Sequence, residues 1–268
     1  GIICCMTMGT DLRDHARPSD PETIRFKGAG VTLVASAWGD PADPPIVFMH
    51  GGGQTRHAWG STAADVAGQG WYAVTLDLRG HGESDWAPGG DYDMISFGAD
   101  VSAVARSFNQ PPVLVGASLG GMSTMLAVGE ADKQEEIASA AVFVDVVPRL
   151  EQTGVERIGG FMREHIEKGF ASLEDAAAVI AAYTPERKRA VNLESLEKNL
   201  RRGDDGRWRW HWDPAFMTMR PDANSGSALY MDRMLDAVRR ITIPTLLVRG
   251  RMSDMVSPEG VAEFLEAV

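Results

Sequence analysis

A serine between two glycines is the feature of this sequence most directly suited to chemistry. Residues 113–121 read VLVGASLGG and place Ser118 in the spacing Gly-x-Ser-x-Gly. The apolar residues before Ser118 predict a buried strand, and the residues from about 119 to 130 predict a helix. A serine in such a tight bend needs neighbours without bulky side chains, which Gly116 and Gly120 provide. The bend would present the hydroxyl at the carboxyl edge of a sheet, beside the positive end of a helix, so we predict a nucleophilic Ser118.

A glycine-rich segment could supply a second part of the same chemistry. Residues 49–54 read MHGGGQ and follow a short apolar strand predicted at 45–49. Glycines let backbone N–H groups approach a negatively charged oxygen closely. A phosphate-binding loop is not predicted, because no Gly-Lys-Ser or Gly-Lys-Thr follows. The alternative is a flexible glycine loop without a catalytic role.

The elements that would position these residues alternate between short apolar strands and helices. We predict a hairpin from the strands at 24–27 and 31–38, followed by buried strands at 45–49, 71–76, 113–116, 140–144 and 244–248. Helical patterns separate most of the buried strands. This alternation indicates parallel strands joined by crossovers, and therefore an α/β fold with a doubly wound, mostly parallel sheet.

The domain organisation follows from where this alternation stops. Residues 1–22 show no periodicity and are predicted to be an N-terminal tail. Residues 149–238 are charged and mostly helical in pattern, without buried-strand runs, so we expect them to form a helical cap. The core would then consist of residues 23–148 and 239–268.

Composition narrows the partners and cofactors of the chain. The 268 residues carry 37 acidic and 26 basic side chains, a net charge of −11 that repels phosphate backbones and argues against nucleic-acid binding. Gly28 and Gly30 begin like a dinucleotide fingerprint, but Leu33 stands where its third glycine or alanine belongs, so no nucleotide is predicted. We expect no metal or organic cofactor, and a small-molecule substrate as partner, with homo-oligomerisation left open.

The same features suggest a location in the cell. The only cysteines, Cys4 and Cys5, are adjacent, so no disulfide framework is expected. The N-terminus has no basic leader, and no stretch approaches the roughly 18 apolar residues of a membrane helix. We therefore expect a cytoplasmic protein that does not bind membranes.

Four segments together resemble one family. They are the serine bend, the MHGGGQ loop, residues 77–84 with the sequence DLRGHGES, and residues 248–256 with the sequence VRGRMSDMV. Nearly all of residues 24–268 is similar to the α/β-hydrolase fold family. The resemblance is to its capped branch of esterases, lactonases, C–C bond hydrolases and non-metal haloperoxidase-like enzymes.

The resemblance implies roles for individual residues. The backbone amides of Gly52 and Leu119 would hold the oxyanion, with Gly53 as a substitute for Gly52. Asp254 would be the acid of a catalytic triad, and Asp145, at the end of the strand at 140–144, is the alternative acid. In this family the loop that here contains His81 is structural, so His81 is expected to pack and form hydrogen bonds rather than to catalyse.

The histidine that completes the family's triad is not found where the resemblance requires it. The family's order is serine, acid, histidine, but no histidine follows Asp254; the six histidines are His15, His50, His57, His81, His165 and His211. The last strand and the histidine loop are thus expected to be missing. Three explanations are open: the chain is incomplete, it binds ligands without catalysis, or His50, His81 or His211 serves instead. We assign no catalytic histidine.

Tryptophans recur at every second position in the predicted cap. Trp208, Trp210 and Trp212 share a face if the segment is extended. They could line an apolar substrate pocket or anchor the cap to the core. Trp210 and Trp212, with Gly53, are our candidate pocket residues.

These observations lead to a functional hypothesis. We expect a serine hydrolase that cleaves carboxylic esters or lactones of small to medium apolar acyl groups through an acyl-enzyme. A C–C bond (meta-cleavage) hydrolase and a perhydrolase or haloperoxidase-like enzyme are alternatives that would use the same triad. A catalytically incomplete ligand-binding protein of the same fold is the non-enzymatic alternative.

Overall fold

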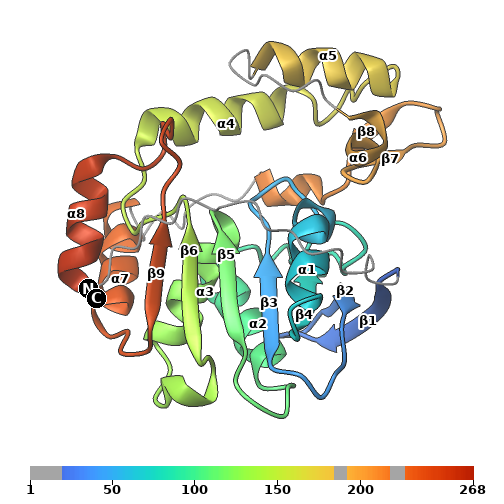
Figure 1. Ribbon diagram of the computed structural model, residues 1–268. Helices are drawn as coiled ribbons and strands as arrows, with labels where there is room; N and C mark the ends of the chain where they lie inside the picture. The colour runs from blue at the N-terminus through green and yellow to red at the C-terminus, as the bar shows by residue number, and fades with distance from the viewer. Residues whose placement is uncertain (1–19, 184–191, 218–226) are drawn as a thin grey trace.

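The computed structural model of the chain describes residues 20–183, 192–217 and 227–268. Cys4, Cys5 and most of the predicted tail lie outside these residues. Figure 1 shows a central sheet with helices on both sides, and a group of helices set above one edge of the sheet.

The sheet has seven strands in the order β1-β2-β4-β3-β5-β6-β9. Strand β2 is antiparallel to both β1 and β4, and all other neighbours are parallel. This confirms the predicted α/β fold with a mostly parallel sheet. The strands are β1 (Glu22–Lys27), β2 (Thr32–Trp38), β3 (Pro45–Met49), β4 (Tyr72–Leu76), β5 (Val113–Ala117), β6 (Ala140–Val144) and β9 (Thr245–Val248).

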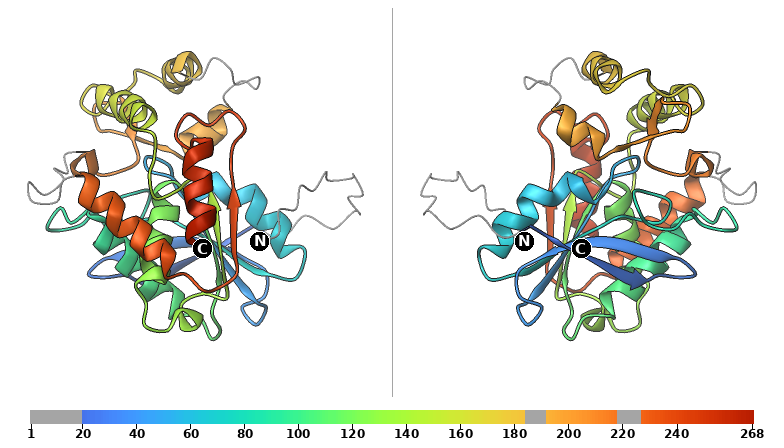
Figure 2. Two further views of the ribbon diagram at one scale, coloured as in Figure 1. Left: turned by 90° about the vertical axis from the view of Figure 1, so that its left-hand side faces the viewer. Right: turned by 90° about the vertical axis from the view of Figure 1, so that its right-hand side faces the viewer.

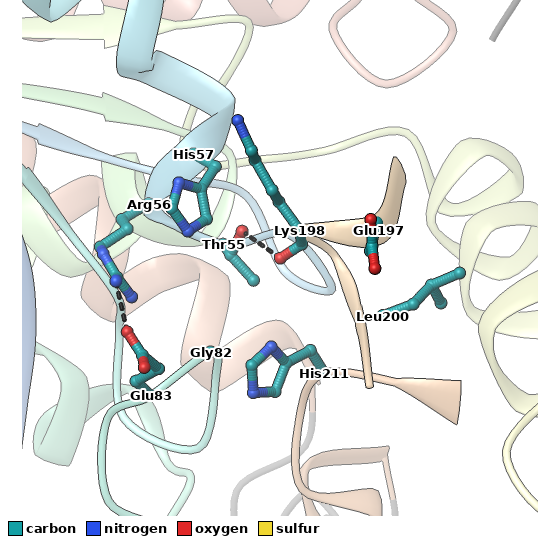
Figure 3. A pocket seen from close by; sticks show the side chains of 9 residues that line it. All are labelled: Thr55, Arg56, His57, Gly82, Glu83, Glu197, Lys198, Leu200 and His211. Atoms are coloured by element: carbon teal, nitrogen blue, oxygen red, sulfur yellow. Dashed lines mark hydrogen bonds and ion pairs between the residues drawn. The ribbon is translucent and has the colours of Figure 1, made fainter. Parts of the chain in front are cut away.

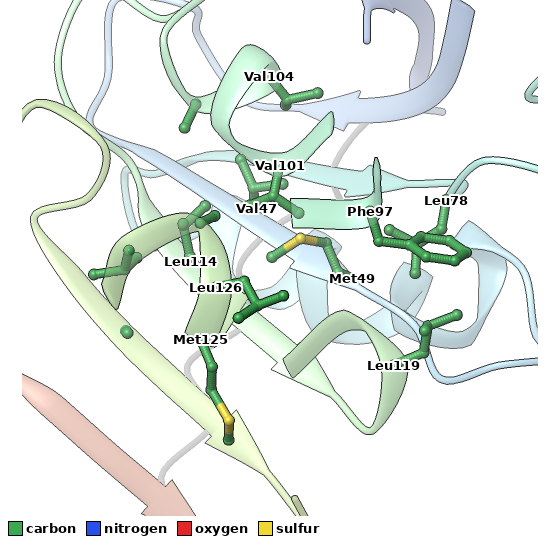
Figure 4. Packing of buried hydrophobic residues seen from close by; sticks show 14 of the residues in the cluster. Val47, Met49, Leu78, Phe97, Val101, Val104, Leu114, Leu119, Met125 and Leu126 are labelled. Carbon is green, nitrogen blue, oxygen red and sulfur yellow. The ribbon is translucent and has the colours of Figure 1, made fainter. Parts of the chain in front are cut away.

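Helices cover the two faces of the sheet unequally. Because side chains alternate along a strand, Val47 and Met49 of β3 face the main hydrophobic core, whereas Phe48 faces a smaller core on the other side. Figure 4 shows the main core, which the helices of one face close. These helices are α2 (Met94–Ala105), α3 (Leu119–Gly129), α7 (Ser227–Arg239) and α8 (Pro258–Ala267). Helix α1 (Gly60–Ala67) packs on the smaller core, next to the short 3-10 helix η1 (Arg56–Trp59).

Strand β9 forms one edge of the sheet. The buried members of the smaller core come from α1, β3, β4 and β5. On β9, by contrast, Leu246 is 49% exposed and Val248 is 44% exposed. In the described part of the chain, the α1 side of the sheet is therefore well covered at its centre and open at β9.

A further group of helices stands above the sheet, in the residue range predicted as a cap, and we call this region the cap. They stand over the carboxyl ends of the parallel strands (Figure 1), and a separate small core of Phe170, Ala176, Leu196 and Leu200 holds part of them together. The elements of this region are α4 (Gln152–Glu164), α5 (Leu173–Tyr183), α6 (Leu193–Glu197), β7 (Leu200–Arg202), β8 (Trp208–Trp210) and the 3-10 helix η3 (Pro214–Met217).

Two details of this region differ from the sequence-based expectation. Strands β7 and β8 pair as an antiparallel hairpin, although no strand is predicted there, because three-residue strands are too short to show a pattern. Helix α7 falls within the predicted cap range, but it packs against α3 and α8 (Figure 2). Gly129 of α3 permits this contact, since a Cβ atom there would lie 2.1 Å from the carbonyl oxygen of Ala237.

None of the helices in the described ranges is long and apolar enough to cross a membrane. A short 3-10 helix, η2 (Gln134–Glu136), precedes β6 and completes the set of elements.

Candidate active site

Ser118 lies in a strained turn between β5 and α3. Its backbone angles are φ 45° and ψ −112°, a conformation that side-chain-bearing residues rarely adopt. The flanking glycines are required by close packing. A Cβ atom on Gly116 would lie 2.5 Å from the backbone of Gly120, and one on Gly120 would lie 2.6 Å from Cβ of Met49. The predicted strand–turn–helix bend is therefore present, and its glycines stand where no larger residue fits.

The glycine loop after β3 lies directly beside this turn. Strands β3 and β5 are neighbours in the sheet, so their carboxyl ends meet at the same edge. The amide of Gly120 donates to the carbonyl of His50 at 3.1 Å. A Cβ atom on Gly51 would lie 3.4 Å from Cβ of Ser118. The structure thus brings together the serine and the loop that the sequence analysis paired.

The amides of this loop are not equally available. Gly53 donates its N–H to Nε2 of His81 at 3.1 Å, and Gly51 donates to Oε1 of Gln54 at 3.0 Å. The N–H groups of Gly52 and of Leu119, the first residue of α3, have no hydrogen-bond partner among the described residues. Gly53 is therefore a poor substitute for Gly52, and the pair Gly52 and Leu119 remains the predicted oxyanion site.

His50 and His81 are held as neutral, structural rings. Nε2 of His50 accepts the N–H of Leu78 at 3.1 Å, and Nε2 of His81 accepts the N–H of Gly53. The proton of each ring must then lie on Nδ1, which donates to a backbone carbonyl: Gly51 for His50 and Arg79 for His81. Burial lowers the pKa of His50 to about 4 and that of His81 to about 3. The structural role expected for His81 is confirmed, and neither ring has a free nitrogen to act as a base.

His211, the third histidine considered as a base, lines a different cavity. This cavity of about 230 Å³ lies between the cap and the loops of the core, and neither Ser118 nor Gly52 lines it. Figure 3 shows His57 and His211 on the walls of this cavity. The hydroxyl of Thr55, from the core, donates to the carbonyl of Lys198, from the cap, at 3.2 Å. Burial lowers the pKa of both imidazoles. The structure therefore does not bring His211 to the serine.

The two candidate acids both lie at the carboxyl edge of the sheet. Asp145 directly follows β6, has a positive φ of 51°, and accepts the N–H of Gly250 at 2.9 Å. Asp254 lies in the loop after β9, and its half-exposed carboxylate pairs with Arg157 of α4 at 2.5 Å. Neither carboxylate is hydrogen-bonded to a histidine within the described residues. The assignment of Asp254, with Asp145 as the alternative, stays a prediction.

The tryptophans divide between two packing roles. Trp208 and Trp210 pack onto the small core of the cap, where Trp210 makes an edge contact with Phe170 at a centroid distance of 5.0 Å. Trp212 is only 2% exposed and forms a β-bridge with His81, which joins the cap to the core. A cavity of about 20 Å³ touches Trp210 and Trp212, too small for a substrate. The indole N–H groups of Trp210 and Trp212 are buried without a hydrogen-bond partner among the described residues, and their role as pocket residues stays a prediction.

Two residues that the sequence analysis did not select contact the glycine loop. A Cβ atom on Gly52 would lie 3.2 Å from the ring of Phe216, and one on Gly53 would lie 2.7 Å from Cε of Met162. Both residues come from the cap, more than a hundred positions along the chain. No motif marks them, because the contact depends on how the cap folds back over the sheet.

The comparisons with known proteins agree with this geometry. Residues 44–268 match the family described as the alpha/beta hydrolase fold. The esterase Rv0045c of Mycobacterium tuberculosis is 30% identical, over 91% of this chain and 77% of that protein. The 3-hydroxybutyrate-oligomer hydrolase of Cupriavidus necator is also 30% identical, over 85% of this chain and 79% of that protein. The chain belongs to the α/β-hydrolase fold family.

Solved structures support the same class. The crystal structure of E-2-(acetamidomethylene)succinate hydrolase matches with a TM-score of 0.77, covering 92% of this chain and 87% of that one, at 21% identity, which supports the fold alone. A structure of the M. tuberculosis esterase matches with a TM-score of 0.69 at 28% identity, covering 93% of this chain and 81% of that one. Family and relatives together identify an enzyme of the ester-hydrolysing branch.

Proposed function

We propose that this protein is a serine hydrolase that cleaves carboxylic esters or lactones of small to medium apolar acyl groups through an acyl-enzyme. One observation carries the proposal: Ser118 stands in a strained turn, beside a glycine loop whose Gly52 amide has no partner among the described residues. Strain of this kind persists where the surrounding structure enforces it, and it is concentrated at functional sites.

The geometry supports a specific sequence of steps. Oγ of Ser118 attacks the carbonyl carbon, and the carbonyl oxygen takes up the negative charge. The N–H groups of Gly52 and Leu119 donate to that oxygen, aided by the N-terminus of α3. The serine proton passes to a base that the described residues do not identify. The base gives this proton to the alkoxide, which leaves as the alcohol. Water, deprotonated by the same base, then attacks the acyl carbon, the carboxylic acid leaves, and Oγ of Ser118 takes back its proton.

The relatives support the type of bond. One is named an esterase and another a hydrolase of 3-hydroxybutyrate oligomers. A small-molecule substrate, a cytoplasmic location, and a surface that binds neither nucleic acid nor membranes belong to the same proposal. The net charge of −11 supports the exclusion of nucleic acid.

A fluorophosphonate probe tests this proposal on the full-length natural protein. We expect one equivalent of probe on Ser118, and no labelling of Ser118→Ala. Ser123→Ala is the matched control, because the Ser123 hydroxyl lies in the same helix and donates to the carbonyl of Leu119 at 2.6 Å. Absence of labelling in a folded, full-length protein would contradict the serine mechanism and favour a ligand-binding role.

A further inference from the structure

Phe216 of the cap lies against the loop that carries the predicted oxyanion amide. The ring is 3.2 Å from the position that a Cβ atom of Gly52 would take, and the Leu119 side chain is 3.8 Å from the same position. The Phe216 ring therefore stands directly beside the Gly52 backbone, and the Leu119 side chain lies close to the same point. A group bound at the Gly52 amide would therefore lie close to this ring.

Four aromatic rings of the core and cap hold Phe216 in place. Its centroid lies 4.8 Å from that of His81, in an edge-to-face contact. Edge contacts with Tyr92, Phe97 and Trp212 follow at centroid distances of 6.1, 6.2 and 6.1 Å. Since His81 and Tyr92 are themselves fully buried, the ring rests on a rigid base.

Asp213 fixes the backbone that carries this ring. The residue is buried, its amide donates to the carbonyl of Gly80 at 2.7 Å, and its carboxylate accepts from the hydroxyl of Tyr92. Burial and this hydrogen bond raise the pKa of Tyr92, so the phenol keeps its proton and continues to donate. The carbonyl of Asp213 accepts the amide of Phe216 at 2.9 Å. The segment is thus attached to the core directly before the ring.

We propose that Phe216, positioned by Asp213, sets the upper size of the acyl group that the enzyme accepts. The inference rests on the proposed function and narrows its substrate class to esters of short acyl chains. The acyl group is the relevant part, because its carbonyl oxygen stays on the Gly52 and Leu119 amides in both the acylation and the deacylation steps. The leaving alcohol contacts this loop in the first step only.

Two ester series measured on the full-length natural protein test the inference. The first varies the acyl chain from acetate to octanoate on a constant p-nitrophenol, and the second varies the alcohol on a constant acetate. In Phe216→Ala we expect the ratio of kcat/KM for octanoate over acetate to rise on the order of tenfold or more, with no comparable change in the alcohol series. Phe216→Leu should give a smaller rise, and it keeps the test open if the alanine variant folds poorly.

A matched control and a positioning variant separate the proposed role from general damage. Phe161→Ala removes an aromatic ring of the cap that stacks on Tyr183 at 4.2 Å and does not touch Gly52, so the ratio should stay unchanged. Asp213→Asn weakens the attachment to Tyr92 and should raise the ratio with labelling of Ser118 retained. An unchanged ratio in a labelled Phe216→Ala protein, or a change confined to the alcohol series, would overturn the inference. If the fluorophosphonate probe did not label Ser118 in the unmodified protein, the proposed function would be overturned instead.

Discussion

Two buried ion pairs of the core contrast with an exposed ion pair that links the cap to the core. In the core, the ion pairs Arg56–Asp77 and Arg79–Asp100 are almost completely buried, with side-chain exposures of 6% and 0%, and of 3% and 1%. Where the cap meets the core, Arg157 of α4 pairs with Asp254 of the loop after β9, and both side chains remain about half exposed. Exposed pairs contribute little to stability, whereas removing one partner of a buried pair leaves an uncompensated charge.

The difference indicates what the buried charges do for the site. The carboxylate of Asp77 accepts the amides of Arg56 and Glu83 as well as the Arg56 guanidinium. This network fixes the loop that contains His81, and His81 in turn holds the amide of Gly53. The buried charges of the core therefore shape the glycine loop that faces Ser118. The exposed Arg157–Asp254 pair takes part in no such buried network among the described residues.

Breaking a buried core pair should have the largest effect. In Asp100→Ala, Arg79 keeps its hydrogen bonds to the carbonyls of Asp91 and Ala29 but loses its counter-charge. We expect the free energy of unfolding to fall by about 3–5 kcal/mol. Urea denaturation followed by tryptophan fluorescence measures the change. A loss below about 1 kcal/mol would mean that water reaches Arg79, and the contrast between core and cap would then fail.

Lowering the pH should destabilise the core through His50, by somewhat less than the Asp100→Ala substitution does. Burial lowers the pKa of His50 from 6.5 to about 4, so the unfolded chain binds its proton at higher pH than the folded chain. The contribution of neutral His50 is complete above pH 6.5 and is lost as the pH falls toward 4. We expect His50 alone to account for a loss on the order of 3 kcal/mol across this window.

Unfolding curves at pH 7 and pH 4.5 test this expectation. His50→Gln removes the titrating ring, so the variant should be less stable at pH 7 but should lose less stability on acidification. Equal losses in the variant and the unmodified protein would show that other groups cause the pH dependence.

The contrast between core and cap also explains how much the sequence predicts. The sheet follows from the alternation of apolar runs and helices, and the strand predicted at 140–144 matches β6 residue for residue. Most of α7 falls in the range 149–238 that was predicted to be mostly helical, but a helical pattern does not tell which surface the helix packs against. The sequence alone therefore could not show that α7 packs against the core.

The candidate site divides in the same way. The proximity of Ser118 to the glycine loop was predictable, because both follow parallel strands and end at one edge of the sheet. The family resemblance alone favoured Gly52 over Gly53. The physical reason, a hydrogen bond from the Gly53 amide to a ring 28 positions away, could not be seen in the sequence. The contact of Phe216 with Gly52 depends on a cap segment still further along the chain. Local geometry was predictable, and long-range contacts were not.

A change in the small core of the cap should act locally. Phe170 is fully buried there, and its backbone pairs with Trp208 through two hydrogen bonds of 2.7 and 2.9 Å. Phe170→Leu should lower the free energy of opening the cap by about 1–2 kcal/mol, because the vacated volume is not refilled. Hydrogen exchange should quicken at the amides of residues 170 and 208 but not in β3 and β5. Faster exchange in those central strands would show that cap and core unfold as one unit.

Breaking the exposed Arg157–Asp254 pair should have the smallest effect on stability. Arg157→Ala removes the partner of Asp254 and the cation above the ring of Tyr183, which lies 5.0 Å away. Because both charges are half exposed, we expect a loss of less than about 1 kcal/mol, and less still in 1 M salt. Urea denaturation at two salt concentrations measures it. A loss as large as that of Asp100→Ala would mean that the cap contact at Asp254 is as important for stability as the buried core pairs, and the comparison would have to be reversed.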